Sequence, residues 1–530
     1  MPISCQASGE YIMKRIVLSI DCGTQSLRAL LFSESGDLVD SVKIPYEPYT
    51  SLHPGWAEQD PEIFWSSLID ACQRLKTKNP IRFDTIRGVG ITTQRATMIN
   101  LDHHGKALRP AITWLDQRKA ADQLPFKFCL YPFLKIVGLS QTVSRLYMDG
   151  KCNWIRQHQP ELWKSTHKYV QVSGFLNHRL TGEFKDSIAS QIGHIPFNYR
   201  KMNWSGRFDP AALLFPVERE KLPELIRPGE AIGKICRRAA VETGLKEGIL
   251  VIACGSDKGC ETLGMGVIDN SMASLSFGTT ATVQTMSASY FEPIPLMPPY
   301  PAPIPNHYNP EIEIFRGYWM ITWFKNEFAH PEVERAARKG VAPEVELDGL
   351  LKQSPPGAMG LMVQPYWGPG LNHPDAKGAM IGFGDIHTKA HVYRAVIEGL
   401  AYALLEGVHI LERRGKIHIR KLAVSGGASQ SDQICQISAD IFNRPLVRGK
   451  TTETSGLGAA IVTAAGVGLY PSIPAAMKNM VTYDTTFEPN AVHASVYHEL
   501  FKRVYLKIYP SLKSLYKEIR VITKYPDPRS

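Results

Sequence analysis

Asp21 is an acidic residue that separates two apolar runs near the start of the chain. Residues 16–20 before it and 27–32 after it are short and apolar, which is typical of buried strands. The turn between them begins with Gly23, where a ligand can approach the backbone closely, and it adds hydroxyl, amide and N–H donors from Thr24, Gln25 and Ser26. A carboxylate beside such a turn suits hydrated Mg²⁺, directly or through water. The stretch predicts a nucleotide-phosphate site, and a buried hairpin with one acidic edge residue fits it equally well.

A second copy of this pattern occurs about half a chain later. Residues 274–280 repeat residues 19–25 in Ser, an aliphatic residue, Gly and Thr, with Ser276 in place of Asp21. Each copy begins one half of the chain and reads as strand, Gly-Thr turn, strand. We expect two similar lobes that face each other, so that both turns, including Gly278 and Thr279, bind one triphosphate.

Further polar turns follow predicted strands. Residues 249–253 form an apolar run that leads to Asp257 and Lys258 at the start of a helix, and residues 421–424 lead to Gly427 and a helix over 431–442. A strand, a glycine turn and a helix bring backbone N–H groups close to a nucleotide. The strand over 86–91 leads to Gln94 and Arg95, with 98–101 as its expected hairpin partner. Trp114 follows another predicted strand end at residue 112.

Apolar periodicity predicts helices over 61–75, 175–180, 318–328 and 391–414. Residues 291–310 contain eight prolines, which excludes a helix or a central strand there, so we expect an extended surface loop.

Composition narrows the class of protein. A chain of 530 residues is too long for one core. The net charge of +10 comes from scattered Lys and Arg without a basic run, which does not favour nucleic acid as a partner. Nine cysteines without a Cys-x-x-Cys pair fit a reducing cytoplasm. Residues 455–477 carry no charge, but glycines and a proline interrupt them, so we expect a buried helix and no membrane span.

Rival nucleotide motifs are absent from the sequence. It has no Gly-x₄-Gly-Lys-Ser/Thr loop, no Gly-x-Gly-x-x-Gly/Ala fingerprint and no protein-kinase motif set. P-loop proteins, Rossmann dehydrogenases and protein kinases are therefore disfavoured.

Three segments resemble the FGGY family of carbohydrate kinases, relatives of glycerol kinase and xylulokinase within the actin and hexokinase superfamily. Residues 378–383 and 391–398 follow the family's second signature, with Phe383 where a smaller aliphatic residue is usual. The first signature is partial over 151–155, where Lys151 and Trp154 are kept, while Cys152 and Met148 depart from it. Residues 453–460 follow the family's closing segment. The resemblance covers about residues 15–471.

The resemblance implies an α/β fold of two actin/hexokinase-like (ribonuclease H-like) lobes, each a mixed sheet flanked by helices, around a central cleft. We expect a sugar-binding and catalytic lobe over 15–265 and a nucleotide-binding lobe over 266–530. Residues 1–14 are expected to be a disordered extension, with Met13 as an alternative start. ATP and Mg²⁺ are the implied cofactors, and a homodimer is left open.

The resemblance also assigns roles. Asp257 is the implied general base toward the sugar hydroxyl, and Asp21 the implied Mg²⁺ ligand. The implied nucleotide contacts are Gly23, Thr24, Gln25, Ser26, Arg28, Gly278, Thr279, Gly427 and Ser431. The implied acceptor contacts are Gln94, Arg95, Trp114, Asp257 and Lys258. Without the resemblance, Arg95 and Lys258 would be read as solvated charges and Trp114 as a core residue.

The acceptor is less defined. Arg95 and Trp114 match acceptor contacts of glycerol kinases, but Ala96 stands where those enzymes carry Glu and Leu146 lies near where they carry Tyr. Lys258 replaces their Gln. A lost carboxylate leaves hydroxyls unpaired at about 1–3 kcal/mol, so glycerol is disfavoured. A pentulose or another polyol is preferred, although the Gln-Met-His pattern of xylulokinases is absent near Gln94.

Two other classes share this fold and stay open. One is a non-catalytic, nucleotide-gated regulator, against which the presence of both Asp21 and Asp257 counts. The other is a filament-forming or chaperone-like ATPase, which would hydrolyse ATP without a sugar.

Overall fold

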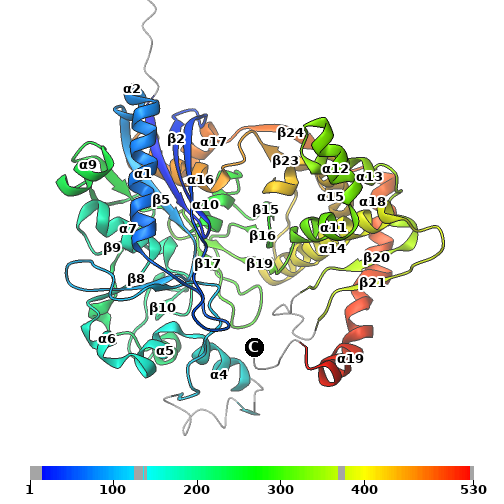
Figure 1. Ribbon diagram of the computed structural model, residues 1–530, viewed down its shortest axis with the longest axis horizontal. Coiled ribbons are helices and arrows are strands. Elements are labelled where there is room, and N and C mark those ends of the chain that lie inside the picture. Colours follow the sequence, from blue (N-terminus) through cyan, green and yellow to red (C-terminus); the bar gives the residue numbers. More distant parts are fainter. Residues whose placement is uncertain (1–14, 125–134, 137–139, 368–375, 526–530) are drawn as a thin grey trace, which may run out of the picture.

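The computed structural model describes residues 15–124, 135–136, 140–367 and 376–525. The extension predicted for residues 1–14 lies outside them. Figure 1 shows two lobes side by side, one built mainly from the first half of the chain and one from the second. Each lobe contains a six-stranded mixed sheet.

The first sheet has the strand order β13-β14-β5-β1-β2-β3. The hairpin of β1 and β2 is antiparallel, and β5 runs parallel to β1 on its other side. The carboxyl ends of β1 and β5 therefore meet at one edge of the sheet. The bounds are β1 (Ile16–Cys22), β2 (Ser26–Ser33), β3 (Leu38–Pro45), β5 (Ile86–Thr93), β13 (Ala231–Lys234) and β14 (Leu250–Ile252).

The second sheet repeats this arrangement strand for strand, in the order β24-β23-β22-β15-β16-β19. Its hairpin of β15 and β16 is antiparallel, and β22 runs parallel to β15. The predicted internal repeat and its second hairpin are confirmed. The bounds are β15 (Met272–Phe277), β16 (Ala281–Thr285), β19 (Glu311–Ile314), β22 (Lys421–Ser425), β23 (Leu446–Gly449) and β24 (Tyr483–Phe487).

Helices cover the apolar faces of both sheets. On the first sheet, α1 (Glu62–Lys78), α7 (Val172–Thr181) and α9 (Arg237–Thr243) form one core. On the second, α11 (Trp319–Phe328), α14 (Lys389–Gly415) and α15 (Asp432–Phe442) pack together. The helices predicted from periodicity are confirmed. Two helix boundaries also lie where the sequence indicates them. Helix α7 ends before Gly182, whose φ is 80°, and Ser431 caps the start of α15.

Two further helices connect the halves. Helix α10 (Asp257–Gly264) packs against α16 (Thr454–Gly466), and α16 covers the face of the first sheet opposite α1. In Figure 1, α16 and α17 (Ile473–Met480) lie beside β2 although they come from the second half. The uncharged stretch over 455–477 is thus a buried helix and its neighbour, as predicted. Within the described residues, no helix has the length and apolar character needed to cross a bilayer.

One predicted pairing is wrong. Strand β6 (Met98–Leu101) does not pair with β5; it joins β4 (Glu58–Gln59), β7 (Ala111–Ile112) and β8 (Lys168–Gln171) in a separate sheet. The chain turns away from β5 at Ala96, whose φ is 56°. This conformation is uncommon outside glycine and is not visible in apolar patterning.

The proline-rich segment also differs from its prediction as a surface loop. It holds a short hairpin of β17 (Tyr300–Pro301) and β18 (Tyr308–Asn309), and Ala302 and Ile304 are buried. A Cβ added at Gly255 would lie 3.2 Å from Pro303, which shows how closely the segment covers the approach to α10. Prolines exclude a helix here, but the apolar residues between them still bury their surface.

The remaining elements complete the lobes. They are α2 (Pro80–Phe83), α4 (Ser140–Asp149), α5 (Lys151–His158), α6 (Pro160–Ser165), β9 (Lys185–Ser187), β10 (Phe197–Asn198), β11 (Asn203–Trp204), α8 (Pro210–Leu214), β12 (Glu224–Ile226), α12 (His330–Lys339), α13 (Pro343–Leu351), β20 (Met362–Gln364), β21 (Ala379–Ile381), α18 (Ala491–Leu500) and α19 (Leu506–Thr523).

The contact between α10 and α16 predicts a stability effect. A Cβ added at Gly458 would lie 1.9 Å from the Cys260 carbonyl oxygen, so Gly458→Ala should lower the free energy of unfolding by about 1–3 kcal/mol. Gly349→Ala in α13 is the matched control, because a Cβ there meets nothing and Ala favours a helix by up to about 1 kcal/mol. Urea unfolding checks both, and equal effects of the two variants would refute the close packing.

Candidate active site

The hairpin of β1 and β2 holds its turn by hydrogen bonds to Gly23. The Gly23 N–H donates to the Ser26 carbonyl at 3.0 Å, and the Tyr46 hydroxyl donates to the Gly23 carbonyl at 2.7 Å. Thr24 is half-buried, while Gln25 is exposed at the tip. These bonds hold the turn from inside the lobe, and Gln25 at its tip is left exposed.

Asp21, at the end of β1, is a buried carboxyl among other charges. Its Oδ2 lies 3.1 Å from Nη1 of Arg28 on β2, and the same Arg28 atom lies 3.6 Å from Glu453, directly before α16. Burial raises the pKa of Asp21 to about 6; Arg28 lowers that pKa, while Asp257 and Glu453 raise it. Negative charge is thus in excess beside the hairpin.

Asp257 is the first residue of α10. The preceding Ser256 caps the helix by accepting from the Gly259 N–H at 3.3 Å, and the Asp257 carboxylate accepts from the Lys258 N–H at 2.7 Å. Burial raises the pKa of Asp257, and Arg95, whose Nε lies 3.8 Å from Oδ1, lowers it. The charge of Asp257 raises the pKa of Asp21, so the two carboxylates predicted to work together lie within electrostatic reach of each other.

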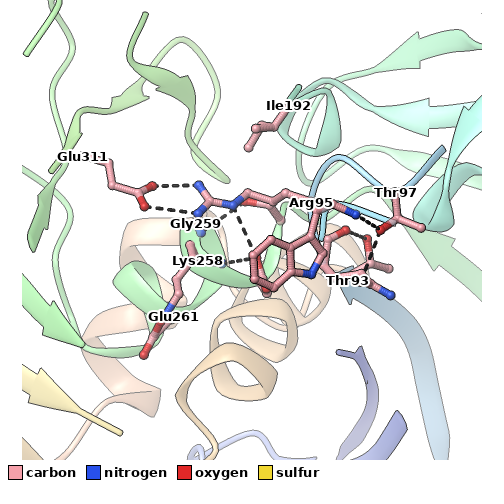
Figure 2. Close-up of polar contacts among 12 residues, drawn as sticks. Thr93, Arg95, Thr97, Ile192, Lys258, Gly259, Glu261 and Glu311 are labelled. Atoms are coloured by element: carbon pink, nitrogen blue, oxygen red, sulfur yellow. Dashed lines mark hydrogen bonds and ion pairs between the residues drawn. The ribbon is translucent and has the colours of Figure 1, made fainter. Parts of the chain in front are cut away.

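Arg95 reaches from the end of β5 to the other half of the chain. Its guanidinium makes two hydrogen bonds to Glu311 on β19, at 2.7 and 3.1 Å, and lies 5.1 Å from the ring centre of Tyr300. Figure 2 shows this alignment with Glu311, with Thr97 on the opposite side. Gln284 donates to Glu311 at 2.6 Å. The predicted acceptor contact Arg95 is therefore also a link between the lobes.

Trp114 and Gln94 lie beside the hairpin turn. Trp114 Nε1 donates to the Thr24 hydroxyl at 2.9 Å, and this hydroxyl donates to Gln94 Oε1 at 3.3 Å. Trp114 is 44% exposed, so its ring offers an open apolar face and is not a core residue. Both predicted acceptor contacts are thereby joined to the predicted phosphate site.

Lys258 turns toward the second sheet. Its Nζ donates to Glu261 at 2.7 Å and to Ser276 on β15 at 2.9 Å, and Figure 2 shows Lys258 directed at Glu261. Burial lowers the pKa of Lys258, but Glu261 and Asp257 outweigh it and raise that pKa overall. The ammonium group is engaged by this chain, beside Asp257.

The predicted nucleotide contacts of the second half lie around two neighbouring turns. The Gly278 carbonyl accepts from the Tyr318 N–H at 3.0 Å, and a Cβ added at Gly426 would lie 3.0 Å from the Gly278 nitrogen. Gly427 and Thr279 are exposed, and nothing within 4 Å faces a Cβ at Gly427. The Ser431 hydroxyl, in contrast, accepts from the Ile434 N–H and donates to Asp348, so its side chain stabilises the start of α15.

The residues beside the hairpin fit Mg²⁺ in one specific way. Within the described residues, no group of three or more His, Cys, Asp or Glu side chains could hold a metal by itself. Mg²⁺ keeps several waters and binds one or two carboxylates together with substrate phosphates. Asp21, buried with an excess of negative charge, fits such a ligand, with the other positions left to water and phosphate.

Lys151 was noted in the sequence only as part of the partial signature over 151–155, without a predicted role in the site. Its Nζ donates to the Ala96 carbonyl at 2.5 Å, at the turn that follows Arg95. Burial lowers the pKa of Lys151 to about 8, and Asp116 opposes this shift. Its place in the family's first signature was the available signal, but its partner could not be read locally.

Glu311 was missed as well. Its signal is the Glu-Ile-Glu-Ile run over β19, which places two carboxyl groups on one face of a strand and two apolar groups on the other.

Comparison with known proteins gives one consistent result. Models of the FGGY family of carbohydrate kinases match the chain, the N-terminal domain over residues 16–264 and the C-terminal domain over residues 273–467. An uncharacterised sugar kinase of Escherichia coli (strain K12), YgcE, is 30% identical over 96% of this chain and 95% of its own length. A xylulose kinase of Staphylococcus epidermidis (strain ATCC 12228) is 27% identical over 97% of this chain and 100% of its own.

A solved structure shows the same fold. The crystal structure of a xylulose kinase from Rhodospirillum rubrum is 25% identical, with a TM-score of 0.82 over 95% of this chain and 100% of that chain. The predicted fold class of two α/β lobes with mixed sheets and flanking helices is confirmed.

The pKa of Asp21 predicts how stability depends on pH. Because folding raises this pKa from an ordinary value near 4 to about 6, the protonated form is favoured in the folded state, and stability falls as pH rises from about 4 to about 7. Asp21→Asn removes this pH dependence. Between about pH 4 and pH 7 the free energy of unfolding should therefore fall by about 2–3 kcal/mol more in wild type than in the variant. Urea unfolding of the nucleotide-free protein measures the difference.

Asp70→Asn on the exposed face of α1 is the control and should follow wild type across the same pH range. If the free energy of unfolding changed with pH in the same way in wild type and in Asp21→Asn, the result would contradict the burial of an unfavourable charge at Asp21.

Proposed function

The chain belongs to the FGGY family of carbohydrate kinases and is an ATP-dependent sugar kinase, and we propose that its acceptor is a small sugar or polyol, with a pentulose preferred. The observation that carries the proposal is the placement of Asp257 beside Arg95, with 3.8 Å between their side chains. The preceding residue Gln94, together with Trp114, contacts Thr24 in the Asp21 hairpin turn. This arrangement supports our proposal that one carboxylate serves both the predicted phosphate site and the predicted acceptor site.

We assign Asp257 as the general base. Its carboxylate would take the proton from the acceptor hydroxyl as the hydroxyl oxygen forms a bond to the γ-phosphorus of ATP and the bond to ADP breaks. Arg95, at 3.8 Å, favours the ionised form that a base requires.

The nucleotide contacts are proposed from both halves. Gly23 would let the phosphates approach the first hairpin closely, where Thr24, Gln25 and Ser26 would donate to them, and Gly278 and Thr279 would contact them from the second hairpin. Arg28 would add positive charge next to Asp21. Mg²⁺, when bound, would neutralise phosphate charge, and Asp21 is the residue we propose to hold it. Gly427, which faces open space, would lie against the adenosine, and Ser431 would support that turn through the start of α15.

The acceptor contacts are proposed to be Gln94, Arg95 and Trp114, with Lys258 acting beside Asp257. An open indole face packs well against the carbon side of a sugar. Relatives that are xylulose kinases support a pentulose. Glycerol is the second candidate, and Ala96 disfavours it because this position offers no carboxylate for glycerol hydroxyls.

Three further statements belong to the proposal. We place the lobe boundary near residue 265, with α16 and α17 returning to the first sheet. The seven described cysteines are free thiols, which supports a cytoplasmic location. A homodimer stays a prediction, to be measured by light scattering.

The acceptor class is tested by ADP release across ketoses, aldoses, polyols and sugar acids, with a control without sugar. We expect release that depends on the acceptor and is highest with a ketopentose. ATP hydrolysis without sugar would favour a chaperone-like ATPase, and nucleotide binding without any turnover would favour a regulator.

The role of Asp257 is tested by Asp257→Asn. The amide cannot accept the proton, so kcat should fall by about 10²- to 10⁴-fold, while ATP affinity stays essentially unchanged. Stopped assays and calorimetry measure the two effects, with Asp70→Asn as a variant that should retain activity. Unchanged turnover in Asp257→Asn would remove this residue from the mechanism.

A further inference from the structure

Strand β19 presents two carboxyl groups on its polar face. Glu311 and Glu313 alternate with Ile312 and Ile314, which are buried in the core of the second lobe. Glu311 lies opposite Gln284 on β16, and Glu313 lies opposite Thr282. Since β16 begins directly after the turn at Gly278, Glu313 lies about 7 Å nearer that turn than Glu311.

The two carboxyl groups differ in their partners. Glu311 is fully engaged by Arg95 and Gln284. Glu313 is only half-buried, and no hydrogen bond or ion pair joins its carboxyl group to another residue in the described part of the chain. It therefore has hydrogen-bonding capacity that this chain does not use.

The surroundings of Glu313 are those of the proposed base. Burial, Glu311 and Asp257 raise the pKa of Glu313, Arg95 and Lys258 lower it, and the net pKa is about 7. These interactions place the Glu313 carboxyl in the same group of charges as Asp257, between the Arg95–Glu311 link and the Gly278 turn.

The balance of charge in this group is negative. Four carboxyl groups, of Asp257, Glu261, Glu311 and Glu313, face the two cations Arg95 and Lys258, which Glu311 and Glu261 already pair. A carboxylate brought in by an acceptor would meet Glu313 and no unpaired cation of this group. Like charges placed together in a binding site disfavour binding, whereas a hydroxyl donates to a carboxylate a charge-assisted hydrogen bond that is stronger than a bond to a neutral amide.

We propose that Glu313 is a specificity-determining residue, which hydrogen-bonds a hydroxyl of an uncharged acceptor next to the reacting end and disfavours sugar acids. The inference rests on the proposed function, because it places the acceptor beside Asp257. It adds to that function a residue and a charge preference that follow from the placement of β19.

The test compares wild type, Glu313→Gln and Glu334→Gln with D-xylulose, D-ribulose and D-gluconate. Glu334 lies on the exposed face of α12 and is the matched control. Glu313→Gln should raise KM for the better ketopentose by about 10- to 100-fold with little change in kcat, and should lower the preference over gluconate by about tenfold or more. Glu334→Gln should match wild type in both respects.

Calorimetric titration of the same sugars in the presence of ADP separates this inference from the proposed function. Ketopentose binding that weakens in Glu313→Gln without turnover in wild type would overturn the kinase assignment and support Glu313 as an acceptor contact. Turnover whose KM and sugar preference are unchanged in Glu313→Gln would overturn the role of Glu313 alone. Wild type that prefers gluconate would overturn it too.

Discussion

The carboxylate of Glu261 joins the two halves of this protein. It is buried on α10, and it accepts hydrogen bonds from Lys258 on its own helix, from Ser276 on β15 at 3.0 Å and from Ser425 on β22. Burial opposes its ionisation, but these donors outweigh burial and lower its pKa. A buried charge is tolerated only when it is paired in this way. Because α10 begins with Asp257, the same bonds fix the proposed base relative to the second sheet.

The two copies of the repeat have diverged at the position that matters for this connection. The first copy keeps Asp21, whose carboxyl group faces the hairpin turn, while the second carries Ser276, whose hydroxyl donates to Glu261. An acidic residue at position 276 would oppose Glu261 inside the protein. The repeat thus supplies two glycine turns of the same shape, but only the first carries the proposed metal ligand, and the second supplies a bond between the lobes.

Local features of the sequence predicted much of the fold. Short apolar runs predicted the two hairpins whose turns contain Gly23 and Gly278, and the cap at Ser431 marked the start of α15. The predictions that were wrong concern features that depend on contacts between residues far apart in the sequence. The partner of β6 is β8, about 70 residues later, and the chain reaches it through the turn at Ala96. Proline counts excluded a helix or a central strand over 291–310, but the burial of Ile304 depends on α10, which lies elsewhere in the sequence.

In the candidate site, too, residue types can be read locally while their pairing cannot, and the pairing changes the charge of the site. The sequence placed Arg95 and Lys258 near the acceptor, and two cations taken alone would suit an anionic one. The structure pairs Arg95 with Glu311, 216 residues away, and Lys258 with Glu261. No local pattern contains the first of these pairings, yet the two pairings together neutralise both cations. Residue types and the family resemblance predicted the reacting groups, whereas the pairing between the lobes underlies the preference among sugars that we propose.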